Sequence, residues 1–185
     1  MLFEATKLQD AFLIKLQKIE DERGFFARSW CKNEFQAQGL DANLAQWNVS
    51  FNRYKGTLRG MHYQSPPHAE TKLVRCTRGA IFDVIIDLRP DSPTFLHWLG
   101  VTLTPDGDDM LYIPKGFAHG FQTLTDGAEI FYQMSDFYAP QSAKGVRWDD
   151  PLFAIQWPLS PTVLSDKDRA LPDAATTQFA ELKGS

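Results

Sequence analysis

An arginine and a histidine stand three positions apart in KGTLRGMHYQS, residues 55–65, a segment with the composition of a strand. Because the side chains of a strand alternate between its two faces, this odd separation places Arg59 and His62 on opposite faces. A β-bulge at Gly60 or Met61 would add one residue and bring both side chains to one face, and glycine is frequent in bulges. We therefore expect a bulge here, with both side chains directed into the interior.

Two further basic or titratable side chains lie in strand-like segments. His119 lies between the aromatic residues Phe117 and Phe121 in IPKGFAHGFQTL, residues 113–124. Lys72 begins the apolar segment KLVRC. Burying positive charge costs several kcal/mol per ion unless an opposite charge compensates it. Together with the first pair, these residues indicate either a site for an anionic ligand or a structural network of ion pairs. His68 and His97 lie in loops, where surface positions are expected.

A metal site is the less favoured interpretation of these histidines. Metal sites in small β-barrels need three or four ligands, commonly histidines together with a carboxylate. Gln64 stands two positions after His62, where a second histidine ligand would be expected, and Lys72 would repel a cation. We therefore expect no metal. A metal-dependent oxygenase or isomerase, with His62 and His119 as ligands, remains an alternative.

Composition and charge narrow the class of protein. The chain has 185 residues, 43% of them hydrophobic, which is enough to bury one core. A net charge of −4 with scattered basic residues predicts no nucleic-acid partner. No signal peptide and no apolar run near the roughly 20 residues of a membrane span are visible. Cys31 and Cys76 form no metal or redox motif and are expected as reduced thiols. We expect one soluble, cytoplasmic domain over residues 1–185, without a membrane partner.

Short apolar runs separated by turn signals predict an all-β fold. Turn-forming sequences such as DERG, RPDSP and PDGDD recur between the apolar runs. One short helix and one helical turn are expected, at 32–39 and 165–174. This pattern is typical of a β-sandwich or β-barrel. The expected strands are 80–88, 97–104, 109–114 and 129–135.

Five segments in this order resemble the dTDP-4-dehydrorhamnose 3,5-epimerase family: TLRGMHYQ, KLVRCTRGAIFDVIIDLRPDSPTF, IPKGFAHGFQTL, FYQMSDFYAP and VRWDDPLFAIQWP. The similarity extends from DERGFF to LSDKD. It implies a cupin-type jelly roll, a homodimer, and no metal or organic cofactor. It also implies epimerisation of a nucleotide-linked 4-keto-6-deoxyhexose in deoxysugar and surface polysaccharide biosynthesis. The segment AFLIKLQKI, residues 11–19, is expected to form an N-terminal strand and is the candidate for pairing with the second subunit.

The resemblance assigns chemical roles to four residues. His62 matches the general base, Asp168 the carboxylate that orients it, and Tyr132 the proton donor on the opposite side of the sugar ring. Lys72 matches a residue of the sugar pocket, where a cation would stabilise an enolate. From the residues alone, Tyr132 could equally be an ordinary strand aromatic and Asp168 a helix cap. The family motifs also imply a substrate-binding set: Arg23, Arg28, Gln46, Trp47, Asn48, Arg59, His119, Tyr138 and Lys167.

Three positions depart from the family pattern. Arg28 stands where a glutamate is usual, Trp47 where an aspartate is common, and Ala143 where the rhamnose-pathway enzymes can carry a glutamate. These changes make the nucleotide region more positive and more apolar, so we infer that the nucleotide or the sugar can differ from dTDP-4-keto-6-deoxyglucose. Inversion at C3, at C5 or at both stays open. A non-catalytic binder of nucleotide sugars that keeps the fold is the remaining alternative.

Overall fold

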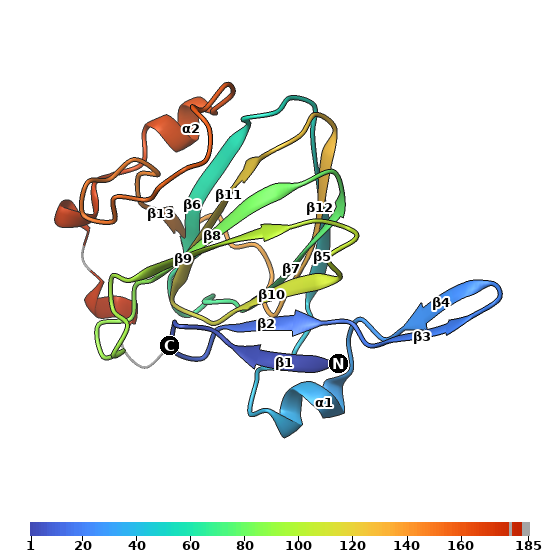
Figure 1. The fold of residues 1–185 in the computed structure, drawn as a ribbon. Coiled ribbons are helices and arrows are strands. Elements are labelled where there is room, and N and C mark those ends of the chain that lie inside the picture. The colour runs from blue at the N-terminus through green and yellow to red at the C-terminus, as the bar shows by residue number, and fades with distance from the viewer. Residues whose placement is uncertain (178, 183–185) are drawn as a thin grey trace.

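Two antiparallel sheets form most of the computed structural model, which describes residues 1–177 and 179–182 (Figure 1). In spatial order, the six-stranded sheet contains β1 (Leu2–Ala5), β2 (Phe12–Lys15), β10 (Asp109–Ile113), β7 (Lys72–Arg78), β12 (Ala128–Met134) and β5 (Gln46–Asn52). The five-stranded sheet contains β13 (Ala143–Gly145), β6 (Leu58–Gln64), β11 (Phe117–Thr123), β8 (Ile81–Asp87) and β9 (Trp98–Leu103). The all-β prediction and its four expected strands are confirmed.

The elements outside these sheets are short. A separate hairpin of β3 (Lys18–Asp21) and β4 (Gly24–Ala27) projects away from the barrel (Figure 1). The predicted helix and helical turn are confirmed as α1 (Lys32–Ala37) and α2 (Asp166–Arg169). Two 3₁₀ turns follow, Ala174–Thr176 and Ala180–Leu182. Among the described residues, no helix has the length and apolar character needed to cross a membrane.

The inner faces of the two sheets share one apolar core. It is built mainly from β-branched and aliphatic side chains, which suit a pleated surface. On β8, alternate residues such as Ile81 and Ile85 enter this core, while Val84 and Ile86 point to the opposite face. That opposite face is also buried, because the chain after β13 packs Phe153 and neighbouring residues over it. Both faces of β8 are therefore covered, which explains its nearly continuous apolar sequence.

The outer face of the six-stranded sheet is covered only in part. Phe35 of α1 packs on Tyr112 of β10, with ring centroids 6.0 Å apart, within an apolar cluster that also includes residues of β2 and β7. Farther along the sheet, Trp47, Val49 and Phe51 of β5 remain exposed. An edge strand therefore carries an uncovered apolar face.

The bulge expected on β6 is present. His119 of β11 faces His62, and Phe121 faces Arg59, so a step of two residues on β11 matches a step of three on β6. Gly60 occupies the bulge with φ +130°, a conformation that favours glycine. A Cβ atom there would lie 2.5 Å from Cα of Gly120 on β11. The extra residue turns Arg59 and His62 toward the same cavity, as predicted from their spacing.

The segment predicted as one N-terminal strand, residues 11–19, is divided. β2 pairs with β1 on one side and with β10 on the other, so its hydrogen-bonding edges are both occupied within the chain. Within the described part of the chain, β3 pairs only with β4. The expectation that the whole segment pairs with a second subunit is therefore wrong for β2, and the β3–β4 hairpin is the part left free to do so.

Candidate active site

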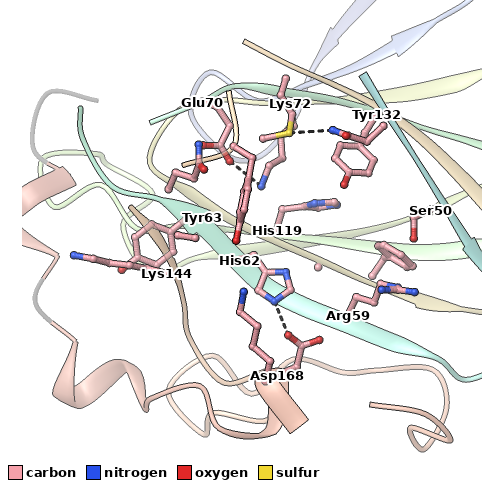
Figure 2. A pocket seen from close by; sticks show the side chains of 18 of the residues that line it. Ser50, Arg59, His62, Tyr63, Glu70, Lys72, His119, Tyr132, Lys144 and Asp168 are labelled. Carbon is pink, nitrogen blue, oxygen red and sulfur yellow. Dashed lines mark hydrogen bonds and ion pairs between the residues drawn. The ribbon is translucent and has the colours of Figure 1, made fainter. Parts of the chain in front are cut away.

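A cavity of about 620 Å³ opens between the two sheets. Side chains from β6, β7, β11 and β12 converge on it, and α2 closes one side (Figure 2). Most of the predicted site residues are among its lining: Gln46, Asn48, Arg59, His62, Lys72, His119, Tyr132, Tyr138, Lys167 and Asp168. Ala143, one of the three departures, also lines it.

His62 and Asp168 form a hydrogen-bonded pair although 106 positions separate them in the chain. The His62 Nε2 atom lies 2.6 Å from Asp168 Oδ1. Asp168 is buried in α2, where its own backbone N–H donates to the Ser165 hydroxyl that caps the helix. Burial alone would raise the pKa of Asp168, but the hydrogen bond with His62 and those from Ser165 and Gly60 lower it below its ordinary value. The carboxylate is thus held ionised behind the imidazole.

A second histidine–carboxylate pair lies next to the first. His119 faces His62 across β11 and β6, and its Nε2 atom lies 2.8 Å from Oδ1 of Asp83. Asp83 is fully buried on β8. Asp83 was not among the residues predicted from the sequence to form the site. The sequence contained a signal for Asp83, because a carboxylate within a continuous apolar strand requires a polar partner.

Lys72 is paired with a carboxylate that the sequence analysis did not select. Its Nζ atom lies 3.1 Å from Oε1 of Glu70, and the side chains are 11% and 2% exposed. Both residues line the cavity. The two-residue separation of Glu70 and Lys72 puts them on the same side of an extended chain, and this spacing was the signal that could have identified the pair.

Arg59 is held differently from the other basic groups. Its Nε donates to Oδ1 of Asn52 at 2.7 Å. Among the described residues no carboxylate forms an ion pair with Arg59, which leaves its guanidinium able to bind an anion. The cavity therefore combines the two arrangements left open by the sequence, an ion-pair network and an anion-binding group.

Tyr132 projects from β12 into the cavity, on the side away from Asp168 (Figure 2). Burial raises the pKa of its phenol, the positive charge of Arg59 opposes this rise, and the Glu70 carboxylate adds to it. The net result is a phenol that keeps its proton beyond the ordinary pH range of tyrosine. A protonated phenol is a possible proton donor to a bound ligand.

The mouth of the cavity is built by β5 and by the loop that follows β12. The backbone N–H of Tyr138 donates to the Gln46 side chain at 2.8 Å, and that of Ala139 donates to the Gln64 side chain at 2.7 Å. These bonds fix the loop, while the ring of Tyr138 is 53% exposed. An exposed aromatic ring beside a polar cavity can stack on a planar group such as a nucleotide base.

Three predicted site residues do not reach this cavity. Arg23 lies at the tip of the β3–β4 hairpin and pairs with Asp21, while Arg28 follows β4 and pairs with Glu34 at 3.0 Å. The hairpin, with Arg23 in its turn, projects away from the barrel (Figure 1), whereas Arg28 lies at the base of the hairpin beside α1. Trp47 points outward because it alternates on β5 with residues that face the cavity. Within one chain, none of the three can contact a ligand in the cavity.

The described residues contain no group of three or more His, Cys, Asp or Glu side chains that could hold a metal ion. The chemistry available from the chain itself is proton transfer. A histidine backed by a carboxylate can accept a proton, a buried phenol can donate one, and an ammonium group in the cavity wall can stabilise negative charge.

Comparison with known proteins agrees with this chemistry. The family model described as dTDP-4-dehydrorhamnose 3,5-epimerase matches residues 5–176. The chain belongs to this family. It is 43% identical over 164 residues to the dTDP-4-dehydrorhamnose 3,5-epimerase of Shigella flexneri, covering 88% of this chain and 90% of that protein.

Solved structures of the epimerase family show the same fold. The enzyme from Bacillus anthracis, crystallised with TDP and PPi, superposes with a TM-score of 0.89 at 43% identity, over 93% of this chain and 98% of that one. The enzyme from Legionella pneumophila, in complex with dTDP-4-keto-L-rhamnose, superposes with a TM-score of 0.91 at 37% identity, over 98% and 97%. The expected cupin-type fold is thereby confirmed for this epimerase-family chain.

Proposed function

We propose that the protein is an isomerase that inverts C3, C5 or both in a nucleotide-linked 4-keto-6-deoxyhexose of the dTDP-4-dehydro-6-deoxyglucose type. The observation that carries the proposal is the opposition of groups across the cavity. His62 and Asp168 lie on one side, and Tyr132 and Lys72 on the other (Figure 2). Family membership supports the substrate class, since relatives are named for this reaction and one was crystallised with a dTDP-linked keto sugar.

The proposed reaction begins at a carbon next to the C4 ketone. His62 accepts the proton of that carbon on the nitrogen not engaged with Asp168, the C–H bond breaks, and its electron pair moves into an enolate whose charge lies on the C4 oxygen. The Lys72 ammonium stabilises that oxygen, a contribution of about 3 kcal/mol for one preorganised group. Tyr132 then donates its proton to the same carbon from the opposite face, which inverts the centre.

The remaining cavity residues are proposed to bind the substrate without exchanging protons with it. Arg59 and Lys167 supply positive charge for the diphosphate, while Gln46, Asn48 and His119 supply polar contacts to the sugar. Tyr138 is proposed to stack on the base at the mouth. Ala143 leaves room and removes a negative charge near these groups, which supports a preference for a nucleotide or sugar other than the usual one.

A homodimer is proposed from the exposed apolar surfaces. The hairpin exposes Phe25 and Phe26 by 54% and 66%, and β5 exposes Trp47 by 60%. An isolated two-stranded hairpin is only marginally stable in water, so a packing partner is needed. Packing of the hairpin on the outer β5 face of a second copy would cover both surfaces. It would also move Arg23 and Arg28 toward the cavity of that copy, as their expected substrate contacts require.

We further propose that residues 1–185 act as a single domain, because both sheets and their covering segments share continuous apolar cores. The cytoplasmic location expected from the sequence remains a prediction.

The decisive experiment follows deuterium incorporation by NMR. The protein is incubated in D₂O with dTDP-, CDP-, UDP- and GDP-linked 4-keto-6-deoxyhexoses, and label at C3 and C5 is measured. Incorporation at either carbon is the expected result and identifies the position and the nucleotide. Binding of one sugar without any incorporation would support a non-catalytic binder. Activity abolished by a chelator and restored by a divalent metal would support the metal-dependent alternative.

A further inference from the structure

The ion pair between Glu70 and Lys72 has both partners buried and both in the wall of the cavity. Among the described residues, the pairs of Arg89 with Asp87 and of His119 with Asp83 are buried to a similar degree. The side chains of Glu70 and Lys72 are 2% and 11% exposed, whereas the pair of Lys15 with Glu4, at the same 3.1 Å, has side chains 41% and 51% exposed. A buried ion pair contributes little to stability compared with apolar residues of the same size. Stability alone therefore does not account for this charge pair in the cavity wall.

The backbone around Glu70 is tied to the strand that carries Tyr132. The N–H of Thr71 donates to the hydroxyl of Ser135 at 2.8 Å, and the N–H of Ser135 donates to the carbonyl oxygen of Thr71 at 3.1 Å. These two bonds continue the pairing of β7 with β12 beyond the end of both strands. Glu70 is thus attached to a rigid sheet rather than to a mobile loop.

Among the described residues, the Glu70 carboxylate forms an ion pair with Lys72 alone. Its Oε2 atom is buried and has no hydrogen-bond partner among the described residues. The ammonium group lies on the cavity side of the carboxylate (Figure 2). Because moving the ammonium away would leave a buried carboxylate wholly unpaired, the lysine side chain is restricted to the position it has here.

We propose that Glu70 is a positioning residue, which holds the Lys72 ammonium where the C4 oxygen of a bound 4-keto sugar gains negative charge. The inference rests on the proposed function and extends it, since it adds a residue that does not touch the substrate. A flexible lysine would have to be ordered during each reaction, and a misplacement of about 1 Å can cost about 10²-fold in rate. The fixed carboxylate removes that requirement.

The test is a double-mutant cycle of Glu70→Gln and Lys72→Met, followed by deuterium exchange and inversion of dTDP-4-keto-6-deoxyglucose, or of whichever nucleotide sugar the wild type accepts. In the wild-type background, Glu70→Gln should lower kcat about 10- to 100-fold and change KM by less than about threefold. In the Lys72→Met background, the same substitution should change the residual rate by less than about twofold. This lack of additivity is what action through Lys72 predicts.

Two results would overturn the inference: a Glu70→Gln variant with kcat within twofold of wild type, or an equal loss in both backgrounds, which indicates a general structural role. Glu4→Gln is the matched control, since it breaks an exposed pair of the same length and should leave kcat unchanged. If Glu70→Gln does not fold, Glu70→Asp retains the charge on a shorter side chain; lower kcat at unchanged KM supports positioning, and wild-type kcat overturns it. Absence of exchange in the wild type with every nucleotide sugar would instead refute the proposed function.

Discussion

His62 enters the cavity with one ring nitrogen already engaged by Asp168, so only the other can receive a proton from a ligand. Replacing His62 by alanine should lower exchange at the substrate carbon by about 10³-fold, within the range of general base catalysis. The rate of deuterium incorporation checks this. His97→Ala, at an exposed position outside the cavity, should retain the wild-type rate. Near-wild-type exchange in the His62 variant would exclude it as the base.

Tyr132 is the proposed proton donor, and the raised pKa of its phenol predicts how the rate of inversion depends on pH. A proton donor acts in its protonated form, and this form persists to higher pH when the pKa rises. Loss of inversion through this group is therefore expected only above about pH 10, the ordinary tyrosine value. Tyr132→Phe should slow inversion more than exchange. An equal loss of both, or an alkaline limb between pH 7 and 9 that disappears in the variant, would contradict the assignment.

At the level of residues, spacing was informative where two polar groups shared one strand. The odd separation of Arg59 and His62 was sufficient to predict the bulge. The partners of the other basic groups required the fold, because Asp83 reaches His119 from another strand. Pairings of this kind depend on strand register, which one sequence does not specify.

Among the elements, β6 depends on the missing side chain of Gly60. Gly60→Ala should destabilise the protein by more than about 2 kcal/mol, since a Cβ would meet the backbone of Gly120 at 2.5 Å while φ is +130°. Urea unfolding measures the difference. Gly24→Ala is the control, because Gly24 has a similar φ of +123° but nothing within 4 Å of an added Cβ. Its cost should be smaller, and equal costs would mean that crowding at the bulge is unimportant.

The four strands expected from the sequence were predictable because each combines apolar residues with flanking turn residues. The one misjudged element is the run from residue 11 to 19, whose pattern continues although β2 ends at Lys15 and β3 begins at Lys18. Apolar periodicity indicates which residues pack, but not whether they pack within one chain or against another. The apolar side chains of the hairpin are exposed in the single chain, although in the sequence they resemble residues of a core.

For the whole molecule, the proposed dimer joins surfaces that each chain leaves exposed. Phe26→Glu should shift the protein toward monomer, because it places a charge in an apolar contact. It should also weaken substrate binding, because Arg23 would lose its position near the second cavity. Light scattering and substrate titration measure the two effects. Leu152→Glu, at an exposed apolar position far along the chain, is the control and should change neither. A Phe26→Glu protein that remains dimeric would place the interface elsewhere.

Most of the residues that line the cavity could be predicted from the sequence, but three predicted residues do not lie in it. Family motifs identified the residues that line it, whereas Arg23, Arg28 and Trp47 lie outside the cavity of their own chain. A motif records that a residue contacts the ligand and does not record which subunit supplies it. The proposed dimer would bring Arg23 and Arg28 toward the cavity of the second subunit.

Because Asp168 lies in α2, the activity of the protein can be lost under milder conditions than those that unfold the barrel. The carboxylate belongs to neither sheet, and α2 is joined to β6 through the bonds of Asp168 with His62 and with the backbone of Gly60. Short segments of this kind open before a core does. On mild heating, or during digestion by a protease that cleaves exposed loops, the enzyme should therefore lose its activity while both sheets are still folded.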